Sequence, residues 1–454
     1  MNNTSSRRAF IGTATRLAIA APAGLAIPAF AHDPESLEDW LMEQRIGSLA
    51  DSRSNDVVAR DESYWARVRR LYNLQPDVLN LDNGWTNPTS SNSIEELARS
   101  SRRLEGLPAE HLPGMWEKIS TVALRASLAK AMNVGGDEIA LLRNATEALD
   151  NVLLGYKLDA GDEIVCSRHD YYAMLDALEQ RKVRDGVVLR IVEPPIPAAS
   201  MDDLVALYRR EINRRTRLVL LTHPSNLTGQ CLPVKRIADI AHAAGADVVV
   251  DGAQSLGLIE DPVKSIGCDY YGASAHKWLG TPVGLGVLWM RPDKMDKVWP
   301  LIPSPLSEKG MARFEWIGTC PEYINVASLP ALALHHQIGA GRKLARIRYL
   351  AANVRESIAT AHPDARFYAN GGDMALGLTT FELQGLDSTK LQSELRSRHG
   401  VLVQAMTGIR SDSRIKGIRV SPNVYTSIAE LRRFAAALKV ATRNAVNQGS
   451  APSF

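Results

Sequence analysis

The chain has 454 residues, of which 45% are hydrophobic and 23% charged, a composition typical of a globular protein with two or three domains. Lysine and arginine number 53 against 50 acidic residues, so there is no basic excess of the kind that nucleic-acid binding requires. Beyond the N-terminal stretch, no window approaches the run of about twenty apolar residues of a transmembrane helix, so we expect no membrane span in the mature chain.

The first 31 residues form a segment of their own. Arg7 and Arg8 precede Phe10 and a weakly apolar stretch, and residues 29–31 (Ala-Phe-Ala) form a small-x-small cleavage pattern. Adjacent arginines before such a stretch are typical of a twin-arginine export signal, and a frayed amphipathic arm is the alternative. We therefore predict that the twin-arginine machinery exports the chain, that residues 1–31 are removed as a signal peptide, and that the mature protein is periplasmic. The removed segment carries three arginines and no acid, so the mature chain is near neutral.

Residues 32–75 are charged and helical in pattern, and residues 81–85 predict a short strand that enters a turn. Beyond this turn, short apolar strands alternate with helical stretches, which indicates a largely parallel sheet covered on both faces. Ligands of such a sheet lie beyond the carboxyl ends of its strands. We predict this large domain over residues 76–327, with strands at residues 138–142, 163–166, 187–192, 218–221, 247–250, 268–271 and 284–290.

A long helical stretch begins near residue 328 and continues to about residue 362. Together with strands at residues 379–383 and 400–403 it predicts a smaller α+β domain over residues 328–447, and residues 448–454 are expected to be a frayed tail. The four cysteines lack metal-site spacing, so we expect no metal site and mostly buried thiols, although a disulfide stays possible in an oxidising compartment. They are Cys166, Cys231, Cys268 and Cys320.

Two residues at expected strand ends suggest the chemistry. Asp251 follows three valines, and a buried carboxylate there needs a partner, either a protonated ring nitrogen or the turn at residues 254–257 that it would cap. Lys277 stands between small residues and Trp278, ahead of a glycine-rich turn, which favours a lowered pKa and Schiff-base chemistry over a solvated surface charge. Ser274 and His276, close to Lys277, can both donate to a phosphate.

These residues lie in two runs, 251–255 (Asp-Gly-Ala-Gln-Ser) and 274–278 (Ser-Ala-His-Lys-Trp), that resemble the signature of class V aminotransferases dependent on pyridoxal 5'-phosphate (PLP). The resemblance extends from about residue 81 to 431 and is strongest to the isopenicillin N epimerase-like branch, which includes exported members. It implies the PLP-dependent transferase fold type I, an α/β fold whose large domain has a mainly parallel seven-stranded sheet and is followed by a smaller C-terminal α+β domain. It further implies that Lys277 carries PLP, Asp251 binds the ring nitrogen and Gln254 approaches the phenolic oxygen.

Further motifs occur in the family's order. Residues 144–148 (Asn-Ala-Thr-Glu-Ala) resemble the turn that holds the phosphate, which implies a role for Ala145 and Thr146; physically this is a helix N-terminus, where anion binding and capping can coexist. By the same resemblance, Asn226 reaches the phenolic oxygen. The pair at residues 318–319 resembles the Gly-Thr pair that contacts the phosphate of a partner subunit, so it implies a homodimer and assigns Thr319 to the cofactor.

Residues 168–174 resemble the loop that stacks a ring on the pyridine. The epimerase-like pattern, an acid followed by Tyr, favours Tyr171, and the pattern of cysteine desulfurases favours His169. Arg419 resembles the arginine that clamps a substrate carboxylate, a task suited to its planar fork; the alternative is a surface arginine. Asn83 is expected at the entrance, together with Trp85, Asn87 and the loop at residues 306–314.

Residues 404–410 hold no cysteine where cysteine desulfurases carry a catalytic one, which disfavours desulfuration. We therefore predict transamination, or a related change at the α-amino group of an amino acid or peptide-linked amine. In this scheme Lys277 moves the proton, Asp251 keeps the ring an electron sink and Tyr171 stacks on it. Epimerisation or a Cα-lyase reaction is the alternative, and a non-catalytic protein that binds PLP or an amine is the third possibility.

Overall fold

A computed structural model describes residues 49–106, 122–304, 309–407 and 412–449. The predicted signal peptide, the predicted helical pattern up to residue 48 and residues 306–308 of the predicted entrance loop lie outside these ranges. Within the described residues, no helix is long and apolar enough to cross a membrane.

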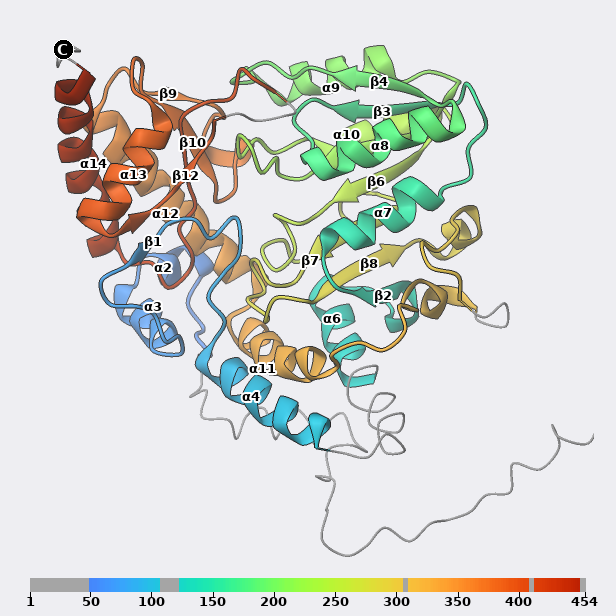
Figure 1. Ribbon diagram of the computed structural model, residues 1–454, viewed down its shortest axis with the longest axis horizontal. Helices are drawn as coiled ribbons and strands as arrows, with labels where there is room; N and C mark the ends of the chain where they lie inside the picture. Colours follow the sequence, from blue (N-terminus) through green and yellow to red (C-terminus); the bar gives the residue numbers. More distant parts are fainter. Residues whose placement is uncertain (1–48, 107–121, 305–308, 408–411, 450–454) are drawn as a thin grey trace, which may run out of the picture.

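The large domain is built on a seven-stranded sheet in the order β2-β8-β7-β6-β5-β3-β4 (Figure 1). Only β8 runs antiparallel to its neighbours, and the other described strands of this sheet are parallel. Most of these strands are buried at every position, as strands covered on both faces must be. The strands are β2 (Ile139–Leu142), β3 (Glu163–Ser167), β4 (Val188–Val192), β5 (Thr216–Thr222), β6 (Asp247–Asp251), β7 (Tyr270–Ser274) and β8 (Gly286–Met290).

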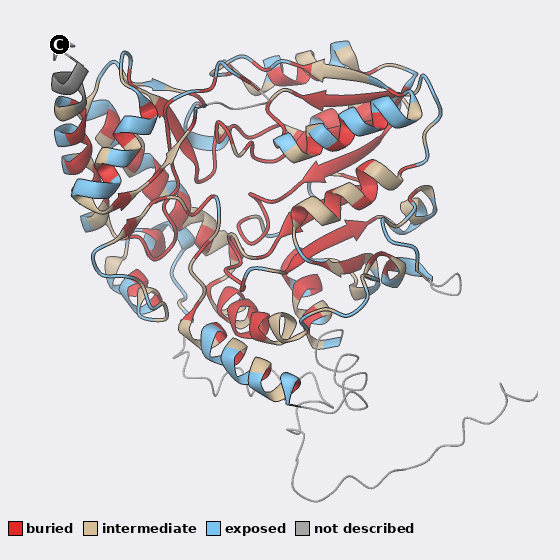
Figure 2. Ribbon diagram, in the orientation of Figure 1, coloured by how far each residue is buried: buried red, intermediate tan, exposed pale blue. Residues whose placement is uncertain are grey.

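Helices cover both faces of this sheet, and Figure 2 shows the sheet buried between them. On one face α7 (Ala145–Gly155) and α8 (Tyr172–Asp185) enclose an apolar core. On the other face α6 (Leu124–Met132), α9 (Met201–Glu211), α10 (Val234–Ala243) and α11 (Tyr323–Ile338) enclose a second one. Helix α4 (Ser91–Glu105) packs outside α11, and short 3-10 turns cover Gly136–Glu138, Pro292–Lys297, Gly310–Phe314 and Gly372–Met374.

The smaller domain has its own core. Its antiparallel sheet has the order β12-β13-β10-β9, and a two-stranded parallel pair, β1 with β11, ties it to the N-terminal part of the chain. The strands are β1 (Leu79–Asn80), β9 (Arg366–Phe367), β10 (Thr379–Glu382), β11 (Val401–Leu402), β12 (Gln404–Ala405) and β13 (Ile418–Val420). Three helices cover this sheet, namely α12 (Ala340–Ala361), α13 (Ser388–His399) and α14 (Ile428–Gly449).

This architecture confirms the predicted fold class, a seven-stranded and mainly parallel α/β sheet followed by a smaller C-terminal domain. One expected element differs in detail. The long helical stretch near residues 328–362 is two helices, because Gly339 adopts a left-handed φ of +85° between α11 and α12. Within residues 49–75, two helices form, α2 (Asn55–Ala59) and α3 (Glu62–Arg69), and both pack near α12 and Trp278.

The carboxyl ends of the parallel strands face the smaller domain (Figure 1). The four cysteines are free thiols, three of them buried and Cys320 partly exposed. The fold therefore brings the loops after β2, β3, β5, β6 and β7 together opposite β13, where the candidate site lies.

Candidate active site

Asp251 occupies the last position of β6, aligned with Thr222 of β5 on one side and Gly272 of β7 on the other. Its side chain is buried, with 4% exposure, and one carboxylate oxygen accepts the N–H of Ala253 at 3.0 Å. Burial raises the pKa of Asp251, while the Ala253 hydrogen bond and the nearby Lys277 ammonium lower it. The carboxylate accepts a hydrogen bond from the turn that follows β6, and its pairing with a ring nitrogen stays a prediction.

Lys277 follows β7, on a turn whose backbone carbonyls accept hydrogen bonds from Asn87, which is distant in the sequence. The carbonyl of His276 accepts the backbone N–H of Asn87 at 3.2 Å, and the side-chain amide of Asn87 donates to the carbonyl of Lys277. Burial lowers the pKa of Lys277 to about 8, with Asp251 opposing and Arg419 reinforcing the shift. An amine with such a pKa is a good nucleophile and base near neutral pH, as Schiff-base chemistry requires.

The N-terminus of α7 forms the anion-binding end of the site. The N–H of Ala145 donates to Ser274 Oγ at 2.8 Å, and the N–H of Glu147 donates to Asn144 Oδ1 at 2.9 Å. Thr146 lies between Ala145 and Glu147, and its backbone N–H is one of those that the first turn of a helix leaves without a partner inside the helix. His276 is half-buried, burial lowers its pKa to about 4, and its Nδ1 has no partner among the described residues.

A glycine makes this approach of helix and sheet possible. Gly286 of β8 lies directly against the turn before α7, and a Cβ there would come within 2.6 Å of the backbone atoms of Asn144. Any larger residue would therefore displace the start of α7 and the amides that it presents.

Tyr171 and His169, the two rivals for the stacking position, have different surroundings. The half-buried ring of Tyr171 lies 4.5 Å from that of Tyr172, measured between ring centroids. Burial and the hydrogen bond to Tyr172 raise the pKa of the Tyr171 hydroxyl, and the Asp251 carboxylate adds to this shift. His169 is buried, and its Nε2 lies 3.1 Å from Asp412 Oδ2 in the smaller domain. Of these two residues, Tyr171 is the one whose pKa is raised in part by the charge of Asp251.

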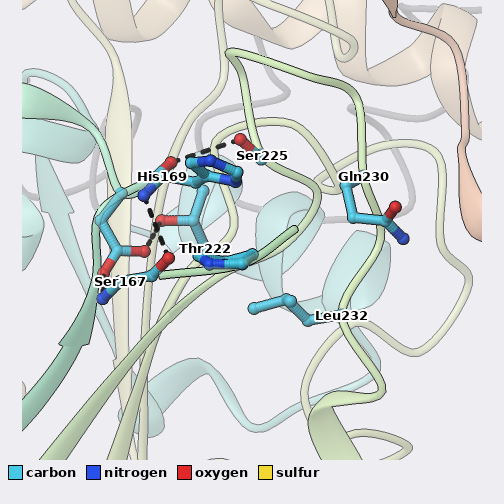
Figure 3. Close-up of a pocket in the computed structure, with 8 residues that line it drawn as sticks. Ser167, His169, Thr222, Ser225, Gln230 and Leu232 are labelled. Carbon is cyan, nitrogen blue, oxygen red and sulfur yellow. Dashed lines mark hydrogen bonds between the residues drawn. The ribbon is translucent and has the colours of Figure 1, made fainter. Parts of the chain in front are cut away.

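Figure 3 shows the surroundings of His169, a small pocket lined by Ser167, His169, Thr222, Ser225, Gln230 and Leu232 among others. Asp170 also lines it and accepts hydrogen bonds from the Ser167 N–H at 2.6 Å and from Thr222 Oγ1 at 2.7 Å. Burial raises the pKa of Asp170 to about 7. The acid of the acid-Tyr pattern therefore fixes the turn from which Tyr171 projects.

Arg419 of β13 faces the site from the smaller domain and is 4% exposed. Its Nη2 donates to Asp82 Oδ1 at 2.7 Å and its Nη1 to the carbonyl of Asn226 at 3.0 Å, while Nε has no partner among the described residues. Asn226 itself has a buried amide oxygen without a described partner. Asp82 was not predicted as a site residue. It lies in the predicted strand and turn at residues 81–85, but no feature of the neighbouring sequence identifies it as the partner of Arg419.

The residues expected at the entrance differ in their exposure to solvent. Asn83 is fully buried, bonding to Asn80, Ser421 and Tyr425, so the structure gives it a place in the core and not at an entrance. Asn87 is buried beneath Lys277, and Trp85 is 62% exposed. Gly310–Phe314 of the expected entrance loop forms a 3-10 turn.

Two expected cofactor contacts lack the unpartnered buried polar atoms found at Asn226 and His276. Gln254 binds the carbonyl of Gly84 through Nε2 at 2.9 Å and the indole N–H of Trp278 through Oε1 at 3.0 Å, so most of its amide is engaged within the protein. Thr319 is exposed on the turn before α11, beside Gly318 with a φ of +76°. A site within one chain gives Thr319 no described partner.

The residues at the strand ends fit PLP. Its pyridinium nitrogen would supply the donor that the Asp251 carboxylate needs, and its phosphate would meet the open N–H of Thr146 and the unpartnered ring nitrogen of His276. The unpartnered atom of Asn226 is its amide oxygen, an acceptor, so the contact of Asn226 with the phenolic oxygen stays a prediction. Lys277 is the described amine next to Asp251 with a lowered pKa. These groups come from the four loops after β2, β5, β6 and β7, and the fold brings them together.

Replacing Asp82 by alanine should destabilise the protein by about 3 kcal/mol, because it leaves the buried Arg419 guanidinium without its carboxylate. Asp82→Asn keeps an acceptor for Nη2 and should lose less. Asp373, 92% exposed in a surface pair with Arg348, is the matched control, and its removal should change little. Urea unfolding of the three variants measures the difference; equal loss from Asp82→Ala and Asp373→Ala would contradict this assignment.

The comparisons with known proteins agree with this geometry. The family model described as aminotransferase class V matches residues 80–434. The isopenicillin N epimerase of Streptomyces clavuligerus is 27% identical over 401 residues, covering 83% of this chain and 98% of that protein. The isopenicillin N epimerase of Amycolatopsis lactamdurans is 29% identical over 409 residues, with the same coverage of both chains.

Solved structures share the fold. The mutant C-DES structure with glycine covalently linked to its PLP cofactor aligns with a TM-score of 0.74 at 20% identity, covering 82% of this chain and 98% of the other. The apo cysteine desulfurase of Thermococcus onnurineus aligns with a TM-score of 0.73 at 22% identity, covering 83% and 98%. Together with the match to the family, these structures agree with the predicted fold and with PLP as the cofactor.

Proposed function

Because the chain belongs to the class V aminotransferase family and is a PLP-dependent enzyme, we propose that it transforms the α-amino group of an amino acid or peptide-linked amine in the periplasm. One observation carries this proposal: the lowered pKa of Lys277 beside the buried Asp251 carboxylate, at the strand ends that face Arg419. A protein that only binds an amine needs no such pairing, which makes a purely binding role the weaker reading.

When bound, PLP supplies the electron sink that makes the hydrogen next to an amine acidic. Asp251 holds a proton at the ring nitrogen, since a buried carboxylate is stabilised by a cationic donor. Arg419 orients a substrate carboxylate through the N–H groups left free by Asp82 and Asn226. The Lys277 amine, with a pKa near 8, takes and returns the α-proton.

Transamination is the favoured outcome, because it needs one residue only. Lys277 could move the proton between the substrate Cα and C4′ of PLP on its own face of the cofactor, without a second acid. Epimerisation needs a second acid on the opposite face, and Tyr171 and His169 are the candidates there; the epimerase relatives favour Tyr171. We also propose a homodimer, in which the exposed Thr319 contacts the phosphate bound by a second subunit.

Incubation with a panel of amino acids and short peptides in D2O, with a keto acid added to accept the amino group, tests the function. We expect deuterium at Cα of the substrate, and the second product then assigns the reaction: a keto acid for transamination, the D-enantiomer for epimerisation, or a cleaved side chain for a lyase. No deuterium in any substrate, with PLP bound, would favour the binding role instead.

Replacing Arg7 and Arg8 together by lysine should abolish export, because the twin-arginine pathway reads the arginine pair. We expect unprocessed protein in the cytoplasm and loss of the periplasmic form that begins at His32, measured by fractionation and N-terminal sequencing. Arg16→Lys, a change in the same segment outside the pair, is the control and should be exported normally. Export of the double variant at the level of the control would contradict the twin-arginine route, and absence of the wild-type protein from the periplasmic fraction would contradict the periplasmic assignment.

A further inference from the structure

A second lysine lies behind the turn that carries Lys277. Lys343 of α12 is 4% exposed, and its ammonium donates to the carbonyl of Trp278, the residue next to Lys277. Its other polar neighbour is Nδ1 of His335 on α11, at 3.4 Å. Among the described residues Lys343 has no carboxylate partner.

A buried cation without an acid is costly to keep, so its place in the fold calls for a reason. Burial lowers the pKa of Lys343 to about 7, and the pKa of His335 is well below its usual value because of burial and the neighbouring Lys343 and His336. A well-packed apolar side chain would serve the core better than this arrangement does. We therefore look for the role of this ammonium in the hydrogen bond that it donates to the Trp278 carbonyl.

The turn at residues 276–278 is held at each of its three carbonyls. Asn87 binds the first two, through its backbone N–H and its side-chain amide, and Lys343 binds the third. The indole of Trp278 in turn donates to Gln254 Oε1 at 3.0 Å. Two separate segments thus hold the backbone on which Lys277 stands, and a third, at Gln254, holds the side chain of Trp278.

Lys343 is the member of this set that comes from the smaller domain's linking helix. The same helix α12 runs from α11 to the domain that carries Arg419 (Figure 1). Its neighbour Arg346, one turn further on and fully buried, binds the carbonyls of Ala59 and Thr426 and the carboxylate of Glu62, so it anchors the helix elsewhere.

We propose that Lys343 is a positioning residue that fixes the orientation of Lys277 through the carbonyl of Trp278. This inference rests on the proposed role of Lys277 as the residue that carries PLP. It does not require Lys343 to touch substrate or cofactor, and its effect is expected on the geometry of the bound cofactor.

The test compares Lys343→Met with Arg346→Met in the holoenzyme and in the apoprotein. Methionine keeps the volume of Lys343 without its charge, so the melting temperature of the apoprotein should be unchanged or higher. The visible circular dichroism of bound PLP should change, and its rate of loss on dialysis should rise about tenfold, the factor that corresponds to one charge-assisted hydrogen bond. Arg346→Met should lower the melting temperature and leave the dichroism unchanged.

The pH dependence of stability gives a second readout that does not depend on the cofactor. The folded pKa of Lys343, about 7, lies below its usual value of 10.5, so the unfolded chain binds its proton more tightly between these values. The cost of burying the ammonium is therefore complete below about pH 7 and disappears as pH rises toward 10.5. The advantage of Lys343→Met over the wild type should be larger at acid than at alkaline pH.

The outcomes separate the two claims. A wild-type protein with no visible band after incubation with PLP would overturn the proposed function, and this inference with it. A normal band in the wild type and in Lys343→Met, with equal rates of cofactor loss, would overturn the inference alone. Loss of stability in both variants with the same dichroism change would show a merely structural lysine. If Lys343→Met does not fold, Lys343→Gln, too short to reach Trp278, repeats the test.

Discussion

Replacing Lys277 by alanine should lower turnover by about 10²- to 10⁴-fold, the contribution of a positioned general base, because no other described amine stands beside Asp251. The variant should still bind PLP through Asp251 and the N-terminus of α7, but without a covalent link. Product formation from the substrate found in the D2O experiment, together with the visible spectrum, measures both effects.

Lys235→Ala is the matched control for this loss. Lys235 is exposed on α10 and pairs with Asp239 four residues away, so its removal touches neither the site nor the core. Activity of the Lys277→Ala variant at the level of this control would remove Lys277 from the mechanism.

Replacing Asp251 by asparagine should have opposite effects on activity and on stability. Activity should fall by about 10²- to 10³-fold, because the neutral amide no longer stabilises a protonated ring nitrogen. The apoprotein, in contrast, should become more stable near neutral pH, because the change removes a buried carboxylate whose pKa is raised by burial. Activity assays and thermal unfolding of the same preparations measure the pair of effects.

The pH dependence of the apoprotein sharpens this prediction. Since the folded pKa of Asp251 lies above its unfolded value of 3.8, the folded state binds the proton more tightly. The stability that this proton contributes is present below the unfolded pKa and is lost as pH rises through the folded pKa. The advantage of Asp251→Asn should therefore grow with pH over that window. An apoprotein whose stability falls on this substitution at neutral pH would mean that Asp251 is already well paired.

Much of the large domain could be predicted from the sequence, since its buried strands are short apolar runs. Strand β7 shows where this signal fails, because we expected residues 268–271 and the strand is Tyr270–Ser274. Its second half is small because α7 packs closely on it. A Cβ at Gly272 would lie 2.7 Å from the side chain of Leu149. Close packing requires small residues here, so this half of the strand lacks the large apolar side chains by which a strand is predicted.

Helix α4 escaped prediction for a related reason. The side chains that it buries are Ser93, Glu96, Ser100 and Leu104, while Ile94 is 49% exposed, so no apolar stripe marks its buried face. Its buried face is small and polar because it lies close against α11.

The candidate site was predictable where its residues stand in local runs, as Asp251, Ser274 and Lys277 do. Contacts between distant segments were not, because they depend on how the two domains meet. The pairing of Asp82 with Arg419 joins residues 337 positions apart, and the bond of Asn87 to the Lys277 carbonyl joins residues 190 apart. Asn83 was misplaced for the same reason, since its partners Ser421 and Tyr425 lie in the smaller domain.

The central claim, that Lys277 carries PLP beside Asp251, is tested most directly by the absorption spectrum of the purified mature protein before and after borohydride, followed by peptide mapping. We predict a visible band that borohydride abolishes and a reduced cofactor attached to Lys277. A protein with no such band after incubation with PLP, or a modified peptide that does not contain Lys277, would contradict the account.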